Sequence, residues 1–80
     1  MNKTVSIHIQ GVPFILEESA YEVLNSYLLS LRNVLKTEEG LEDIIQDVEL
    51  RIVELLQLHK ANGAQVIEEA MIKTIIKKIG

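Results

Sequence analysis

An 80-residue chain is long enough for one small domain with a single modest core and too short for two domains. Its 12 acidic and 8 basic side chains give a net charge of -4, which disfavours nonspecific attraction to nucleic acid or to an anionic membrane. Cysteine is absent, which excludes disulfides and thiolate metal sites, and no apolar run approaches the roughly 20 residues of a membrane span. We predict one domain over residues 1–80, stabilised by packing alone.

The N-terminal part has the pattern of a two-stranded ribbon. Apolar and polar residues alternate along residues 4–10, which is typical of a half-buried strand. The run stops at Gly11, and residues 13–16 predict a second short strand that returns antiparallel to the first. Pro13 has no amide hydrogen, so this strand should lie at an edge or begin where no hydrogen bond is needed. A two-stranded ribbon is only marginally stable by itself, so it must pack against helices.

The next segment predicts a helix that begins at Ser19. Ser19 and Glu22 have the spacing of a capping box, in which each side chain bonds the backbone amide of the other residue. Arg32 and Lys36 fall near the predicted end, where the helix dipole favours positive charge. Helical spacing places one apolar stripe on this helix, made of Ala20, Val23, Leu24, Tyr27, Leu28, Leu31, Val34 and Leu35.

Residues 41–59 predict the central helix of the fold. A break over residues 37–40 precedes it, with Thr37 able to cap the new helix. Because this connection is short, the two helices should form an antiparallel hairpin. The predicted core stripe of the central helix is Leu41, Ile44, Ile45, Val48, Ile52, Leu55, Leu56 and His59.

The C-terminal part predicts a third helix. Asn62 and Gly63 stop the central helix, and residues 65–67 could add a brief extended segment beside the ribbon. From Glu68 onward acidic residues come first and lysines last, which matches the helix dipole. The predicted fold is therefore α+β, a two-stranded β ribbon packed on three helices in the order β-β-α-α-α. The apolar positions of the third helix are Met71, Ile72, Ile75, Ile76 and Ile79.

The sequence predicts no catalytic residues, no cofactor and no metal. His8 and His59 are the two histidines, and no cluster of potential ligands accompanies either one. The serines have no Gly-x-Ser-x-Gly frame, so a nucleophilic triad lacks support. The carboxylates between Glu42 and Glu49 lack the loop spacing of calcium sites and read as an acidic helix surface.

Two groups on the central helix are candidate functional residues. The first is an ion ladder of Asp47, Arg51 and Glu54, in which Arg51 either anchors a carboxylate of a partner or forms structural ion pairs, and we favour the second interpretation. The second group lies opposite Val48 and Ile52 and is apolar in its middle. It is either a seam for another helix or a pair of scattered exposed aliphatics, and the sequence leaves both open. This candidate partner face consists of Gln46, Leu50, Val53 and Gln57.

The order of motifs resembles one protein family. The motifs are Lys3-Thr4-Val5, Gly11, Glu17-Glu18-Ser19-Ala20-Tyr21, Asp47-x-Glu49-x-Arg51-Ile52-x-Glu54-Leu55 and Ile76-x-x-Ile79-Gly80. Together they resemble the N-terminal domain that precedes the membrane-embedded part of bacterial phage-shock-protein-C-like (PspC-domain) proteins. The resemblance implies a cytoplasmic module of a longer protein, tethered to the inner membrane by a downstream segment and linked to stress response and transcriptional regulation. Pro13 and the pair Glu68-Glu69 depart from the family pattern.

We therefore predict a noncatalytic regulatory or protein-interaction module. Its partner is another protein or a second copy in a homodimer, and nucleic acid is disfavoured. A DNA-binding regulator domain is the first alternative, and a small enzyme is the second. Lys73, Lys77 and Lys78 are explained by the dipole of the third helix without a phosphate ligand.

Overall fold

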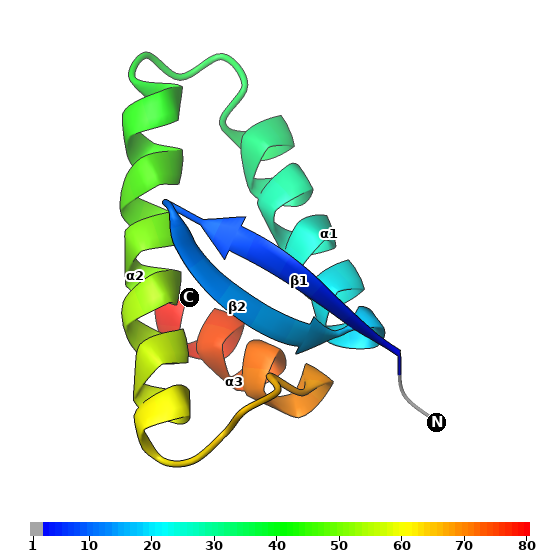
Figure 1. Cartoon of the computed structure of the whole chain (residues 1–80). Helices are drawn as coiled ribbons and strands as arrows, with labels where there is room; N and C mark the ends of the chain where they lie inside the picture. The colour runs from blue at the N-terminus through cyan, green and yellow to red at the C-terminus, as the bar shows by residue number, and fades with distance from the viewer. Residues whose placement is uncertain (1–2) are drawn as a thin grey trace.

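The computed structural model describes residues 3–80, so Met1 and Asn2 of the predicted domain lie outside the described residues. It contains an antiparallel ribbon followed by three helices (Figure 1). This order confirms the predicted α+β fold. The elements are β1 (Thr4–Ile9), β2 (Val12–Glu17), α1 (Glu18–Val34), α2 (Leu41–Ala61) and α3 (Glu69–Ile79).

A tight turn sets the register of the ribbon. Gln10 and Gly11 both have positive φ, 50° and 80°, as in the two-residue turns whose twist matches that of antiparallel strands. The turn pairs Ile7 with Phe14 and places most apolar residues of both strands on one face, whereas Ile15 lies on the other face and is 46% exposed. The first face packs on the helices, where Phe14 and Leu16 are buried.

Ile67 extends the ribbon at the outer edge of β2. Its amide donates to the carbonyl of Ile15, and its carbonyl accepts from the amide of Glu17, both at 2.9 Å. Of the segment 65–67, which the sequence left open as a third extended piece, only Ile67 pairs with the ribbon, in a single parallel bridge. Backbone groups alternate sides along a strand, so Pro13 turns the same edge outward as Ile15 and Glu17. The proline therefore costs no hydrogen bond to β1, as predicted for an edge strand.

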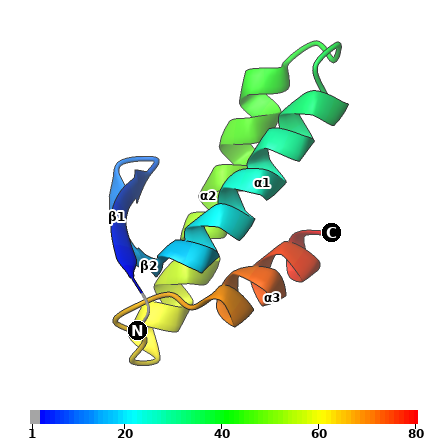
Figure 2. The same cartoon turned by 90° about the vertical axis from the view of Figure 1, so that its right-hand side faces the viewer.

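The ribbon and α3 lie on opposite faces of the α1–α2 hairpin, near the end where α1 begins and α2 ends (Figure 2). The far end of the hairpin extends beyond both of them, and the molecule measures 40 × 23 × 22 Å. The main core lies where all five elements meet. It consists of Ile9, Phe14, Leu16, Ala20, Leu24, Ile52, Val53, Leu55, Leu56, Ile67, Ile72 and Ile75.

Two residues on the predicted buried stripes are exposed. Val34 is 75% exposed and Ile44 is 38% exposed, so the prediction that they belong to the core is wrong. Both lie next to the connection between α1 and α2, at the far end of the hairpin. Periodicity identified the apolar side of each helix correctly, but the ribbon and α3 cover only part of its length. Ile45 alone among the described residues of this end is buried outside the main cluster, at 2% exposure.

The predicted N-terminal caps of the first two helices are also wrong, whereas the predicted stop of the second helix at Asn62 and Gly63 is confirmed. The first helix starts at Glu18, its N-cap is Glu17, and no side-chain hydrogen bond caps it. Because β2 leads directly into α1, Ser19 is the second residue of the helix and not its N-cap, and the amide of Glu18 donates to the carbonyl of Lys3 at 2.8 Å. Likewise, α2 is preceded by Gly40 in the left-handed conformation (φ 78°) and not by a capping Thr37.

Side chains of β2 and α1 hold the start of α3. A carboxylate oxygen of Glu17 accepts a hydrogen bond from the amide of Glu69 at 3.4 Å, which satisfies one of the unpaired amides of that helix. Lys73 lies 2.7 Å from the Glu69 carboxylate, and Ser19 of α1 is close enough to this carboxyl to lower its pKa. Ser19 thus lies beside the start of α3 and does not cap its own helix.

The contacts of the Glu69 carboxylate predict how the stability of the fold depends on pH. Lys73, by hydrogen bond and charge, and then Ser19 lower the pKa of the Glu69 carboxyl below its ordinary value of 4.5. Since the folded-state pKa is the lower one, the stabilisation is complete above the unfolded-state pKa and is lost as the pH falls through the folded-state pKa. We expect Glu69→Gln to make unfolding less pH-dependent below about pH 4.5.

NMR titration of the Glu69 side-chain carbonyl carbon measures the effect directly. Lys73→Met should raise the midpoint toward the ordinary value, and Ser19→Ala should raise it by less. Lys77→Met is the matched control, because it removes a lysine of the same helix without touching Glu69. An unchanged midpoint in Lys73→Met would contradict this account.

Candidate functional site

The predicted partner face is interrupted by a buried residue. Gln46, Leu50 and Gln57 are exposed on α2, with Leu50 at 44%. Val53 is only 6% exposed and belongs to the main core. The prediction that these four residues form one exposed stripe is therefore wrong at Val53, and Leu50 is left as a single exposed leucine between two glutamines.

Val53 is buried because this flank of α2 faces the ribbon. Glu49, one turn earlier, accepts a hydrogen bond from the Gln10 side chain at 2.7 Å. Lys60, two turns later, places its ammonium group 5.4 Å from the centre of the Phe14 ring. Residues at these spacings share one side of a helix. The side on which a ribbon docks cannot be read from the periodicity of α2 alone.

The predicted ion ladder forms only one link. Arg51 pairs with Glu54 at 3.4 Å, and both side chains are more than half exposed. Within residues 3–80, Asp47 makes no ion pair with Arg51. Exposed pairs of this kind contribute about 1 kcal/mol or less, so the ladder carries little of the stability.

A different ion pair closes one side of the hairpin. Arg32 donates to both carboxylate oxygens of Glu42, at 2.6 and 3.3 Å. The interaction raises the pKa of Arg32 and lowers the pKa of Glu42, in each case mainly through the hydrogen bond. The spacing of charges within each helix does not predict this pair. The signal was the placement of opposite charges on either side of a short helix connection.

The apolar side chains at the far end of the hairpin lie on the side opposite the ribbon. Glu42 is two turns before Glu49, so the Arg32–Glu42 pair lies on the ribbon side. Val34 and Ile44 each follow a member of this pair by two residues, which is about 200° around a helix. They therefore point to the side on which α3 packs, but beyond the end of α3.

We call this surface the distal face. Val34 and Ile44 are its exposed residues, and they are flanked by half-buried aliphatic side chains. Acidic residues follow its α2 edge, among them Asp43 and Asp47. The distal face consists of Leu31, Val34, Leu41, Ile44 and Val48.

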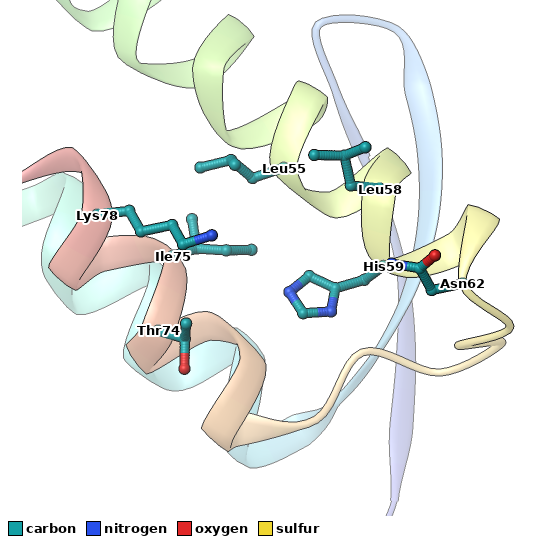
Figure 3. Close-up of a pocket in the computed structure, with 7 residues that line it drawn as sticks. All are labelled: Leu55, Leu58, His59, Asn62, Thr74, Ile75 and Lys78. Atoms are coloured by element: carbon teal, nitrogen blue, oxygen red, sulfur yellow. The ribbon is translucent and has the colours of Figure 1, made fainter.

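Grooves lie on two sides of the folded core, among the residues that the structure describes. The smaller, of ≈170 Å³, lies between the end of α2 and α3, and His59 extends from α2 toward α3 within it (Figure 3). The larger, of ≈470 Å³, lies beside the ribbon and includes His8 and Lys60. The two histidines are thus in different grooves, and within residues 3–80 no three potential metal ligands of the His, Cys, Asp and Glu types gather. The smaller groove is lined by Leu55, Leu58, His59, Asn62, Thr74, Ile75 and Lys78.

The different burial of Leu50 and Val53 can be tested with the same substitution at both positions. Val53→Glu places a carboxylate in the apolar core without a partner, and we expect it to lower the free energy of unfolding by more than about 3 kcal/mol. Leu50→Glu is the matched control on the same helix and should change it by less than about 0.5 kcal/mol. Urea denaturation followed by circular dichroism measures both values. Equal effects at the two positions would refute the placement of the ribbon over Val53.

Comparisons with known proteins identify no relative of this chain. Across residues 3–80, none of the helices has both the length and the apolar composition needed to cross a membrane. No protein-family model, no curated protein and no solved structure matches the chain.

Proposed function

We propose that this protein is a noncatalytic protein-interaction module and that the distal face is its binding surface. The observation that carries the proposal is the exposure of Val34 and Ile44 at one end of the α1–α2 hairpin. Both are apolar residues in helical positions that neither the ribbon nor α3 reaches. Apolar groups held in this way on a rigid helical scaffold suit the binding of a partner helix.

The energetics of the distal face favour a partner over solvent. Complete burial of an aliphatic side chain of this size contributes about 1.5–3 kcal/mol. Two such side chains, with half-buried neighbours around them, supply the apolar centre of a small interface. The acidic residues beside them form a polar rim. Leu50, which is exposed between two glutamines, has no such apolar surroundings on its own face.

The resemblance to PspC-domain proteins supports a regulatory role for this binding. In that reading the module is cytoplasmic and is tethered to the inner membrane through a downstream segment. A partner that covers the distal face would change the assembly of the tethered protein, and this change would be the regulatory signal in a stress response linked to transcription. No cofactor or catalytic group enters this mechanism.

Site-specific photocrosslinking tests the binding surface. A photoreactive phenylalanine at position 44 should give a discrete protein adduct in cells, and the adduct should disappear with Val34→Asp. The same group at position 50 is the matched control, since Leu50 lies on the same helix and is similarly exposed. Equal crosslinking at positions 44 and 50, or none at either, would contradict the proposal.

The alternative of a DNA-binding regulator has its own measurement. The basic end of α3 would have to contact phosphates, and binding would then weaken steeply as salt is added. We expect fluorescence anisotropy with a labelled DNA duplex to show no such salt-dependent binding. A steep salt dependence that is abolished by Lys77→Glu with Lys78→Glu would favour the DNA-binding alternative instead.

A further inference from the structure

We infer that the occupant of the distal face is a second copy of this chain, packed antiparallel to the first across a two-fold axis. This inference rests on the proposed function and names the partner for its binding surface. It is carried by two charge clusters of opposite sign near the apolar surface. Because the two clusters lie apart in the fold, a second copy of the chain can set opposite charges against both of them. A partner surface of a single charge sign cannot do so.

The first cluster is acidic and lies at the far end of the hairpin. Residues 38–47 contain five carboxylates and no lysine or arginine. Glu42 is engaged by Arg32, whereas the others make no ion pair within residues 3–80. The unpaired carboxylates are Glu38, Glu39, Asp43 and Asp47.

The second cluster is basic and lies at the end of α3. Residues 73–78 contain three lysines and no carboxylate. Lys73 is held by Glu69, but Lys77 and Lys78 make no ion pair with any of residues 3–80. Ile76 and Ile79 interleave with these lysines and are only half-buried, so the basic cluster also has an apolar side.

Within one copy the two clusters cannot neutralise each other, because α3 packs at the opposite end of the hairpin from the 35–40 connection (Figure 2). A two-fold axis perpendicular to the hairpin reverses the direction of the second copy. It brings distal face against distal face and sets the acidic cluster of each copy opposite the basic end of α3 in the other. This charge contact then forms twice, once on each side of the axis. A partner of uniform negative or positive charge would oppose like charge at one end.

Sedimentation velocity of the purified chain over about 1 μM to 1 mM tests the dimer. We expect a reversible monomer–dimer equilibrium. Val34→Asp and Ile44→Asp should each raise the dissociation constant at least tenfold. Leu29→Asp is the matched control, since Leu29 is 59% exposed on α1 but lies outside the distal face, and it should leave the equilibrium unchanged. Circular dichroism verifies that each variant retains its helices.

A pair of charge-reversal variants tests the orientation. Lys77→Glu with Lys78→Glu makes both clusters acidic, and Asp43→Lys with Asp47→Lys reverses two carboxylates of the other cluster. Each double variant alone should dimerise at least tenfold more weakly than the wild type. An equimolar mixture should form heterodimers, because every charge contact across the two-fold axis is then between opposite charges.

The outcomes separate this inference from the proposed function. A chain that stays monomeric up to about 1 mM, or dimers that are insensitive to Val34→Asp and Ile44→Asp, overturn the inference. A monomeric chain whose position 44 still crosslinks to a different protein overturns the inference and leaves the proposed function standing. Charge-reversal variants that do not pair when mixed overturn the antiparallel arrangement.

Discussion

The position of α3 depends on a short backbone contact between Ile67 and the edge of β2. Two hydrogen bonds of 2.9 Å tie residue 67 to Ile15 and Glu17, which are far earlier in the chain. Glu17 is also the last residue of β2 and the N-cap of α1, so no flexible loop separates the ribbon from the first helix. Its carboxylate then bonds the first amide of α3. One strand end thus orients two helices, and Ile67 and Leu16 are buried beside each other in the core.

This junction concentrates the packing at one end of the molecule. The main core gathers side chains from both strands and all three helices near the junction, while the hairpin extends away from it (Figure 1). A small domain buries a limited fraction of its surface, and here the two covering elements are both short. The result is a helical hairpin whose far end keeps its own apolar side chains partly in solvent. The distal face follows from this geometry.

Charge in this protein contributes little to stability. The three ion pairs among residues 3–80 are all partly or largely exposed, and exposed pairs are weak. Burial of aliphatic side chains supplies most of the stabilisation, with Phe14 as the single aromatic of the core. The charges are instead partly segregated: residues 38–47 contain five carboxylates and no basic residue, although Arg32 and Lys36 precede them, and residues 73–78 contain three lysines and no carboxylate. Such segregation affects which partner binds and in which orientation more than it affects folding.

The sequence by itself determined the elements, their order and the apolar side of each helix, since these depend on local periodicity and on residues such as Pro13, Gly40 and Gly63. It also indicated the extended segment before α3, because Val66 and Ile67 are β-prone. Only the tertiary structure decided which parts of each apolar stripe are covered. Val53 became core because the ribbon packs on its flank, whereas Val34 and Ile44 stayed exposed because no element reaches them. Ser19 lies beside Glu69 of α3, while the first amide of its own helix bonds the carbonyl of Lys3, just before β1. In each case the deciding contact comes from residues distant in the sequence, and helical periodicity contains no information about where such residues pack.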